Sequence, residues 1–204
     1  MLWCRLALSG SLLPSARLAG AHRSYSVIHR ANKRIVFING PISDDTSSDV
    51  IDRLHFLDSE DPSKPIHLYI HSDGGSVNAG LAIYDAMQDI RSRISTLCIG
   101  QACSIGSLLL AAGAPGERRA FPHSEIMIHQ PSCEISGQVG VVAIRVKEIL
   151  KVYDRLIMIY SRHTGQPIQR IEQCMERDMD MSPDEAKELG LVDEVIVLPL
   201  ALRC

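Results

Sequence analysis

Residues 94–112 of the chain read ISTLCIGQACSIGSLLLAA, and this stretch carries the clearest structural signal in the sequence. Residues 94–100 form a short apolar run that ends at a glycine, which predicts a buried strand. The segment from Ser104 to Ala112 is apolar on every side, which predicts a short helix buried in the core. A strand followed at once by a buried helix favours a domain that mixes α and β structure.

The same alternation extends to both sides of this stretch. Apolar runs bounded by turn residues predict further strands at 34–40, 65–71, near Arg119 and at 125–129. Helical spacing of apolar residues within 43–61 and within 81–90 predicts a helix between successive strands. Alternating strands and helices indicate βαβ crossovers, so an α/β fold with a largely parallel sheet is expected.

A long amphipathic helix is expected from Gln138 to about Arg162, because apolar residues recur there in steps of three and four. Gly165 suits its C-terminal end. Its apolar stripe packs either on the chain's own sheet or on another subunit, and the spacing does not separate these two interpretations.

Two shorter features close the sequence. Ser182 and Glu185 form a capping box with proline at the first helical position, which predicts a short helix ending at Gly190. An apolar run follows at 191–200.

Composition narrows the functional classes. The chain has 204 residues, a net charge of -3 and 4% aromatic residues, so no nucleic-acid partner is expected. The six cysteines form no C-x-x-C pair, so we expect free thiols in a reducing compartment and no metal. The sequence contains no P-loop, so the chain cannot hydrolyse ATP itself. We also expect no cofactor. No apolar run approaches the ~18 residues of a membrane span, so no membrane partner is expected.

The N-terminal segment contains arginine and serine but no acidic residue before Asp44. Such a segment is typical of an organellar transit peptide. We therefore expect a transit peptide at residues 1–24, a folded domain at residues 25–204, and location in the mitochondrial matrix, with a plastid or the cytoplasm as alternatives. A secretory signal is the rival interpretation, but the apolar run at 6–13 is short and broken by Ser and Gly.

Ser104 is the candidate nucleophile. Small residues two before and two after it, between a strand and a buried helix, resemble a nucleophile elbow with Ala102 in place of the first glycine. A serine at a helix start is also a common N-cap, so both interpretations stay open. Cys103 is an alternative nucleophile, but neighbouring residues at a helix start point in different directions and cannot both face one base.

A serine nucleophile needs a base, an orienter for that base and donors for the oxyanion. His129, at the end of an apolar strand, is the candidate base, although a structural role is open for any of the eight histidines. Gly74 and Gly75 are candidates for the donors, because glycine lets the backbone approach a ligand; a plain turn is the alternative. Asp178 and Asp180 are both candidate orienters, and the residues alone do not choose between them.

Six blocks of the sequence resemble the ClpP family of serine peptidases in order and spacing, over about residues 34–197. These blocks are Gly74-Gly75, Gly80-Leu-Ala-Ile-Tyr-Asp85, Gly100-Gln-Ala-Cys-Ser-Ile-Gly-Ser-Leu-Leu-Leu110, Met127-Ile-His-Gln-Pro131, Glu176-Arg-Asp178 and Met181-Ser-Pro183. The resemblance implies Ser104 as nucleophile, His129 as general base and then acid, and Asp178 as orienter. It also implies an oxyanion hole made by the backbone N–H groups of Gly75 and Ile105.

The resemblance further implies a crotonase-like α/β fold, a βαβ spiral with a protruding handle of helix and strand. The long helix from Gln138 would be this handle, which favours its packing on another subunit. Family members stack two seven-membered rings of identical or similar subunits around a closed chamber. They degrade unfolded polypeptides delivered by an ATP-driven AAA+ unfoldase of the ClpX type.

The sequence departs from the family pattern in three places. Asp73 stands where a proline usually precedes the glycine pair. A carboxylate about 8 Å from the oxyanion would oppose its charge by about 2 kcal/mol, roughly a thirtyfold rate loss, unless it points away.

Cys133 and Glu134 replace the usual glycine pair in the handle turn that pairs with substrate, so altered substrate affinity or cleavage preference is expected. Few residues precede Arg34 once a transit peptide is removed, which implies earlier cleavage or weaker coupling to the unfoldase.

Two other functions compete with an active peptidase. One is a non-catalytic ring subunit, although such relatives lose members of the triad that are all present here. The other is an acyl-CoA enzyme of the crotonase class, which shares the fold but does not need Ser104, His129 and Asp178 together.

Overall fold

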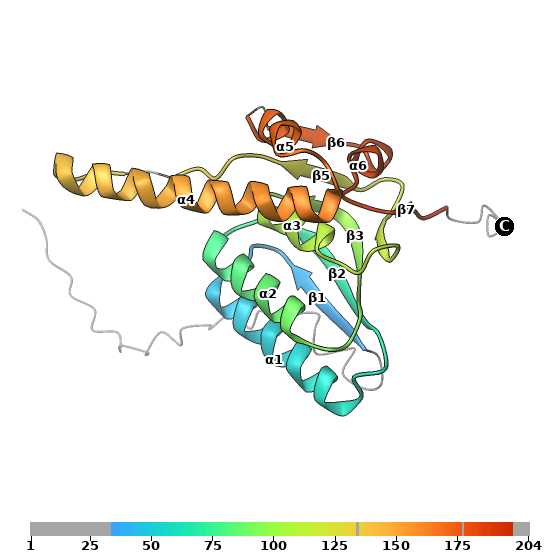
Figure 1. The fold of residues 1–204 in the computed structure, drawn as a ribbon. Coiled ribbons are helices and arrows are strands. Elements are labelled where there is room, and N and C mark those ends of the chain that lie inside the picture. Colours follow the sequence, from blue (N-terminus) through green and yellow to red (C-terminus); the bar gives the residue numbers. More distant parts are fainter. Residues whose placement is uncertain (1–33, 134, 177, 198–204) are drawn as a thin grey trace, which may run out of the picture.

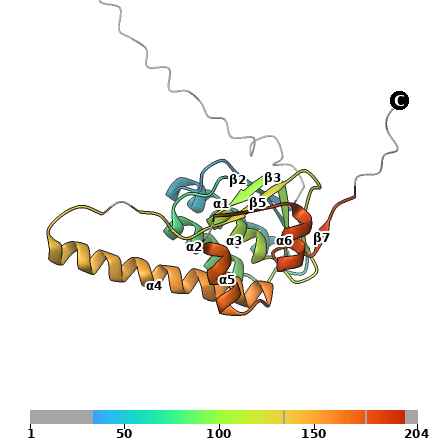
Figure 2. The same ribbon diagram turned by 90° about the horizontal axis from the view of Figure 1, so that it is seen from above.

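The computed structural model describes residues 34–133, 135–176 and 178–197 (Figures 1 and 2). The expected transit peptide at 1–24 lies outside them. The strands are β1 (Ile35–Asn39), β2 (Ile66–Ser72), β3 (Ile94–Cys103), β4 (Arg118–Ala120), β5 (Glu125–Ile128), β6 (Met179–Met181) and β7 (Glu194–Val195). The helices are α1 (Asp44–Glu60), α2 (Val77–Asp89), α3 (Ile105–Ala111), α4 (Val139–Thr164), α5 (Ile168–Met175) and α6 (Pro183–Leu189).

The strands form one sheet that is parallel except at one edge. Its main order is β1-β2-β3-β4-β7, and all of these pairs are parallel, which confirms the α/β class predicted from the sequence. β3 is longer than predicted and has two neighbours on the same side. Its first half pairs with β4 and its last three residues pair in parallel with β5. β6 pairs antiparallel with β5.

One face of the sheet is covered more fully than the other. Val36 and Ile38 of β1 are buried, as are alternate residues of β2. α1 and α2 lie side by side on this part of the domain (Figure 1). Phe37 and Tyr69 point to the other face, where their rings meet edge to face at 5.2 Å and stay half-exposed. The strand predicted at 34–40 is present as β1, and the alternation of buried and half-exposed residues along it shows that only one of its faces is packed in the core.

The short helix α3 is the centre of the core. All seven of its residues are buried, as the sequence predicted. It contacts β2, β3 and β5 of the sheet, α2 beside it, and α4. The close fit to α2 depends on Gly80, because a side chain there would begin 2.1 Å from Ile105 Cγ1.

α4 projects far beyond the rest of the domain (Figures 1 and 2). Its buried residues are confined to Leu156, Ile157, Ile159 and Tyr160 near the C-terminal end, and Gly165 ends it in a left-handed conformation. Apolar side chains earlier in the helix are exposed, including Val139, Ile144 and Leu150 at 87%, 64% and 55%. The helix is thus the protruding element that the sequence predicted. Among the described residues of 130–138, which lead into it, no strand is formed.

The capping box at Ser182 and Glu185 is present, and Gly190 ends α6 as predicted. The sequence analysis did not locate α5 or β6. Only Glu194–Val195 of the apolar run at 191–200 forms a strand among the residues described there.

A buried arginine ties four elements together. The Arg118 side chain is 9% exposed and forms a salt bridge of 2.6 Å with Asp193. Its guanidinium also donates to the carbonyl oxygens of Ala111, His163 and Gly190, at the ends of α3, α4 and α6. Burial opposes ionisation of Asp193, but hydrogen bonds from Arg118 and its positive charge hold the pKa of this carboxyl below its ordinary value.

We predict that Asp193→Asn lowers the free energy of unfolding by about 3 kcal/mol at pH 7, because it leaves a buried guanidinium without its counter-charge. The lowered pKa of Asp193 means that this stabilisation is present above the ordinary carboxyl pKa and is lost as the pH falls through the lower folded-state value. Urea unfolding at one protein concentration measures the difference, which should shrink below about pH 4. The matched control is Glu194→Gln, which breaks the exposed pair with Arg119 and should cost less than about 1 kcal/mol. Equal losses in the two variants would contradict the prediction.

Candidate active site

The site begins where two neighbouring parallel strands end. Cys103, the last residue of β3, is in register with Met127 of β5. Ser104 follows β3 and His129 follows β5, so the hydroxyl and the imidazole leave the same edge of the sheet. Ligands of open α/β sheets bind at this edge, beyond the carboxyl ends of the strands.

Ser104 has a strained backbone. Its φ of 54° and ψ of -127° make it the one residue other than glycine with positive φ in the described part of the chain. Such a conformation costs about 1–3 kcal/mol in a residue with a side chain. The Ser104 N–H donates to the Met127 carbonyl at 2.9 Å, and the Ser104 side chain makes no capping hydrogen bond to α3. This strand-to-helix turn has the geometry of a nucleophile elbow rather than of an ordinary N-cap.

Gly74 lies directly against this turn, and Gly75 lies against Ile42. A Cβ atom on Gly74 would stand 2.8 Å from Ser104 Cβ, and a Cβ atom on Gly75 would stand 2.3 Å from the Ile42 carbonyl oxygen. Both glycines also have positive φ, at 102° and 146°. Two motifs about thirty residues apart in sequence therefore meet, and only glycine fits between them.

Sheet register places a carboxylate beside His129. In the antiparallel pair of β5 and β6, Ile128 lies opposite Met179, so the next step puts His129 opposite Asp178. His129 Nδ1 and Asp178 Oδ1 are 3.6 Å apart, slightly longer than a hydrogen bond. Asp180 lies opposite Met127 instead. The register thus separates the two aspartates that the sequence alone left equivalent.

Ser104 and His129 line one small cavity of about 10 Å³, together with Ile105, Pro131 and residues of α4. No hydrogen bond joins the Ser104 hydroxyl to the His129 ring among the residues that the structure describes. Catalytic hydrogen bonds often tighten only when substrate is bound. Because His129 Nδ1 faces Asp178, its Nε2 is the nitrogen left for the hydroxyl.

Two backbone N–H groups near Ser104 are not used by the surrounding structure. Ile105 is the first residue of α3, so its N–H has no acceptor within the helix. Gly75 forms a parallel bridge with Ile42, but the hydrogen bonds of this bridge involve the carbonyl of Gly74 and the N–H of Ser76. The N–H groups of Gly75 and Ile105 therefore stay available to a ligand.

Cys103 is a poor alternative nucleophile. Its thiol is buried, and burial raises its pKa, as do the negative charges of Glu125, Asp180 and Asp73. The reactive form of cysteine is the thiolate. A neutral thiol beside Ser104 leaves the serine hydroxyl as the better candidate.

Asp73 is exposed to solvent, and its charge reaches the end of β3, as its effect on the Cys103 pKa indicates. Exposure reduces the influence of a charge, because water and salt screen it. We therefore expect a smaller rate penalty from Asp73 than the thirtyfold derived from sequence.

The sequence analysis missed two hydroxyl groups behind the nucleophile. Ser107 Oγ lies 2.7 Å and Tyr160 Oη 3.0 Å from the Ser104 carbonyl oxygen. Tyr160 fits the apolar stripe of α4, so its spacing indicated a core residue. The partner of its hydroxyl is more than fifty residues away in sequence, and no local signal reveals it.

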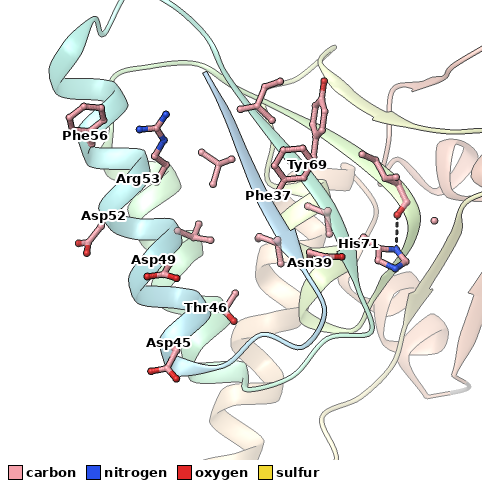
Figure 3. Close-up of a pocket in the computed structure, with 17 residues that line it drawn as sticks. Phe37, Asn39, Asp45, Thr46, Asp49, Asp52, Arg53, Phe56, Tyr69 and His71 are labelled. Atoms are coloured by element: carbon pink, nitrogen blue, oxygen red, sulfur yellow. Dashed lines mark hydrogen bonds between the residues drawn. The ribbon is translucent and has the colours of Figure 1, made fainter. Parts of the chain in front are cut away.

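A much larger cavity lies elsewhere, between α1 and the edge strand β1 (Figure 3). It has a volume of about 880 Å³ and is lined by apolar residues such as Phe37 and Tyr69, with acidic residues of α1 along one side. Two of its polar side chains are engaged: Thr46 donates to the Pro41 carbonyl, and His71 bonds the Ile99 carbonyl. A large apolar pocket is the usual place to look for an active site, but the reactive groups meet at Ser104. We interpret the cavity as a binding surface.

The described residues contain no group of three or more side chains placed to hold a metal ion. None of the helices in the described ranges is long and apolar enough to cross a lipid bilayer.

Comparison with known families agrees with the geometry. The family model described as Clp protease matches residues 19–198, which is most of the chain. This match covers the glycine pair, the Ser104 turn, His129, Asp178 and the projecting helix. The chain belongs to the Clp protease family, a family of serine peptidases.

Proposed function

We propose that this chain is a serine endopeptidase with Ser104 as nucleophile, His129 as general base and then acid, and Asp178 as orienter of His129. The observation that carries the proposal is the convergence of three strand ends. Three residues lie together at one edge of the sheet: Ser104 in its strained turn after β3, His129 after β5 and Asp178 before β6. Membership of the Clp protease family supports a peptidase role for these three residues.

In the proposed reaction, His129 Nε2 takes the proton of Ser104 Oγ as the oxygen attacks the scissile carbonyl carbon. The N–H groups of Gly75 and Ile105 donate to the oxyanion. His129 then gives the proton to the leaving amine, and the C–N bond breaks to leave an ester on Ser104. Water attacks this ester with the same help from His129, which releases the carboxylate product and restores the hydroxyl.

We propose that the working unit is a closed chamber of stacked seven-membered rings of identical or similar subunits, fed with unfolded polypeptides by an AAA+ unfoldase of the ClpX type. The chain supplies no ATP chemistry and needs no cofactor. Two surfaces support assembly: the exposed apolar side chains of α4 and the half-exposed face of β1 and β2. Parallel sheets are usually covered on both faces. The acid-free N-terminal segment supports location in the mitochondrial matrix.

Two alternatives remain distinguishable by experiment. A non-catalytic ring subunit would assemble but would not react with a serine-directed probe. An acyl-CoA enzyme would use the oxyanion donors without the Ser104 hydroxyl, so it would bind acyl-CoA and would not react either.

We predict that a fluorophosphonate probe labels the assembled protein and that Ser104→Ala abolishes labelling. Peptide hydrolysis should fall roughly 10⁵- to 10⁶-fold, because the nucleophile is lost. Cys103→Ala is the matched control at the adjacent position and should keep labelling. Labelling that survives Ser104→Ala, or an assembled wild-type protein that is never labelled, would refute the proposed chemistry.

A second prediction separates the two neighbouring aspartates. Asp178→Asn should lower kcat roughly 10³- to 10⁴-fold, because His129 loses the carboxylate that holds its tautomer. Asp180→Asn, two residues further along β6, should change kcat by less than about fivefold, since its register partner is Met127. Steady-state hydrolysis of a fluorogenic peptide measures both, and similar losses would show that Asp178 has no special role.

A third prediction concerns the charge of Asp73. Asp73→Asn should raise kcat/KM about threefold at low ionic strength, because it removes a screened negative charge near the oxyanion. The increase in kcat/KM should be smaller in 1 M salt. Asp49→Asn removes an exposed carboxylate on the large cavity instead and should have no effect. An unchanged rate in Asp73→Asn would mean that the carboxylate points away from the reacting atoms.

A further inference from the structure

Two buried hydroxyl groups bracket the peptide group next to the proposed nucleophile. Ser107, from α3, is fully buried, and Tyr160, from the C-terminal end of α4, is 2% exposed. Their oxygens are 2.9 Å apart. The Ser107 hydroxyl is placed to donate to the Ser104 carbonyl at 2.7 Å or to the Met127 carbonyl at 2.8 Å, and the Tyr160 hydroxyl donates to the Ser104 carbonyl at 3.0 Å.

These contacts are more than a helix start requires. The Ser104 carbonyl already accepts the N–H groups of Ser107 and Leu108 at the beginning of α3. The hydroxyls of Ser107 and Tyr160 also lie within hydrogen-bonding distance of this carbonyl, and both residues are buried away from water. Burial also raises the pKa of Tyr160 well above its ordinary value, so its hydroxyl keeps its proton and stays a donor.

The Ser104 carbonyl and the Ile105 N–H belong to one peptide group. This group is planar and trans, so its C=O and N–H bonds point in opposite directions. A constraint on the direction of the carbonyl therefore fixes the direction of the N–H. Hydrogen bonds to the carbonyl oxygen also polarise the group, which strengthens the N–H as a donor.

We propose that Tyr160 and Ser107 are positioning residues that aim the Ile105 N–H at the oxyanion by holding the Ser104 carbonyl. This inference rests on the proposed function. Ser107 also contacts the Met127 carbonyl, which accepts the Ser104 N–H and lies two residues before His129. This buried cluster thus connects the turn that carries Ser104 to the strand that precedes His129. Tyr160 contributes to it from the C-terminal end of α4.

The test compares Tyr160→Phe with Tyr84→Phe in the full-length assembled protein. Tyr84 is a matched control, because it is also buried and its hydroxyl also bonds a residue of α4, the His163 ring at 3.0 Å. We expect Tyr160→Phe to lower kcat about tenfold with KM unchanged, less than the 10²- to 10³-fold loss of a whole oxyanion donor. The rate constant for fluorophosphonate labelling should fall by a similar factor. Tyr84→Phe should stay within about twofold of wild type in both measurements.

Ser107→Ala gives a second, independent variant. It should lower kcat in the same way, and the double variant Ser107→Ala/Tyr160→Phe should lose less than the product of the two single losses, because both hydroxyls act on one carbonyl. The pH dependence of kcat/KM should keep its shape, since neither hydroxyl bonds the His129 ring in the described part of the chain. Native mass and the urea midpoint check assembly and stability.

The possible results distinguish the positioning role of Tyr160 and Ser107 from the proposed peptidase function on which it rests. If the wild-type protein is labelled at Ser104 but Tyr160→Phe and Tyr84→Phe have equal rate constants, the positioning role is overturned and the peptidase stands. If the wild-type protein is not labelled, both are overturned. A rise in KM with unchanged kcat would also overturn the inference, because it would indicate lost substrate binding instead of a misdirected N–H.

Discussion

The backbone at Ser104 is the constraint on which the rest of the site depends. A residue with a side chain and a φ of 54° holds that conformation only where its surroundings leave no alternative. Here the Ser104 N–H is bonded to β5 and its carbonyl is held by α3 and α4. Gly74 then closes the remaining side, with no room for a methyl group. Four segments of the chain thus cooperate to direct one hydroxyl away from the helix that it precedes.

β5 links the Ser104 turn to the other two reactive groups, His129 and Asp178. It is parallel to β3 on one side and antiparallel to β6 on the other, so its C-terminal end lies beside the end of β3 and the beginning of β6. A shift of one residue in either register would move His129 away from Ser104 or from Asp178 and turn its side chain to the other face of the sheet. The geometry of the site is therefore a property of strand pairing, and Arg118 keeps the surrounding helix ends in place.

Local pattern predicted most of the fold, and the parts that it missed are those set by distant contacts. Periodicity located α1, α2 and α4, an apolar segment located α3, and cap residues marked the ends of α4 and α6. β6 has three residues and exists through its pairing with β5, so it carries no signal of its own. The glycine pair and Ser104 could be named from their residue types, but only the folded chain shows that they touch. Tyr160 resembled a core residue in the sequence, because the carbonyl that accepts its hydroxyl lies 56 positions away.

The most direct test of the account is a crystal structure of the assembled protein treated with a peptide boronic acid, which bonds covalently to an activated serine. We expect boron bonded to Ser104 Oγ, a φ near 54° at Ser104, and one boronate oxygen within hydrogen-bonding distance of the N–H groups of Gly75 and Ile105. Boron bonded to another residue, or a Ser104 backbone relaxed to negative φ with the Ile105 N–H turned away from the boronate, would contradict it.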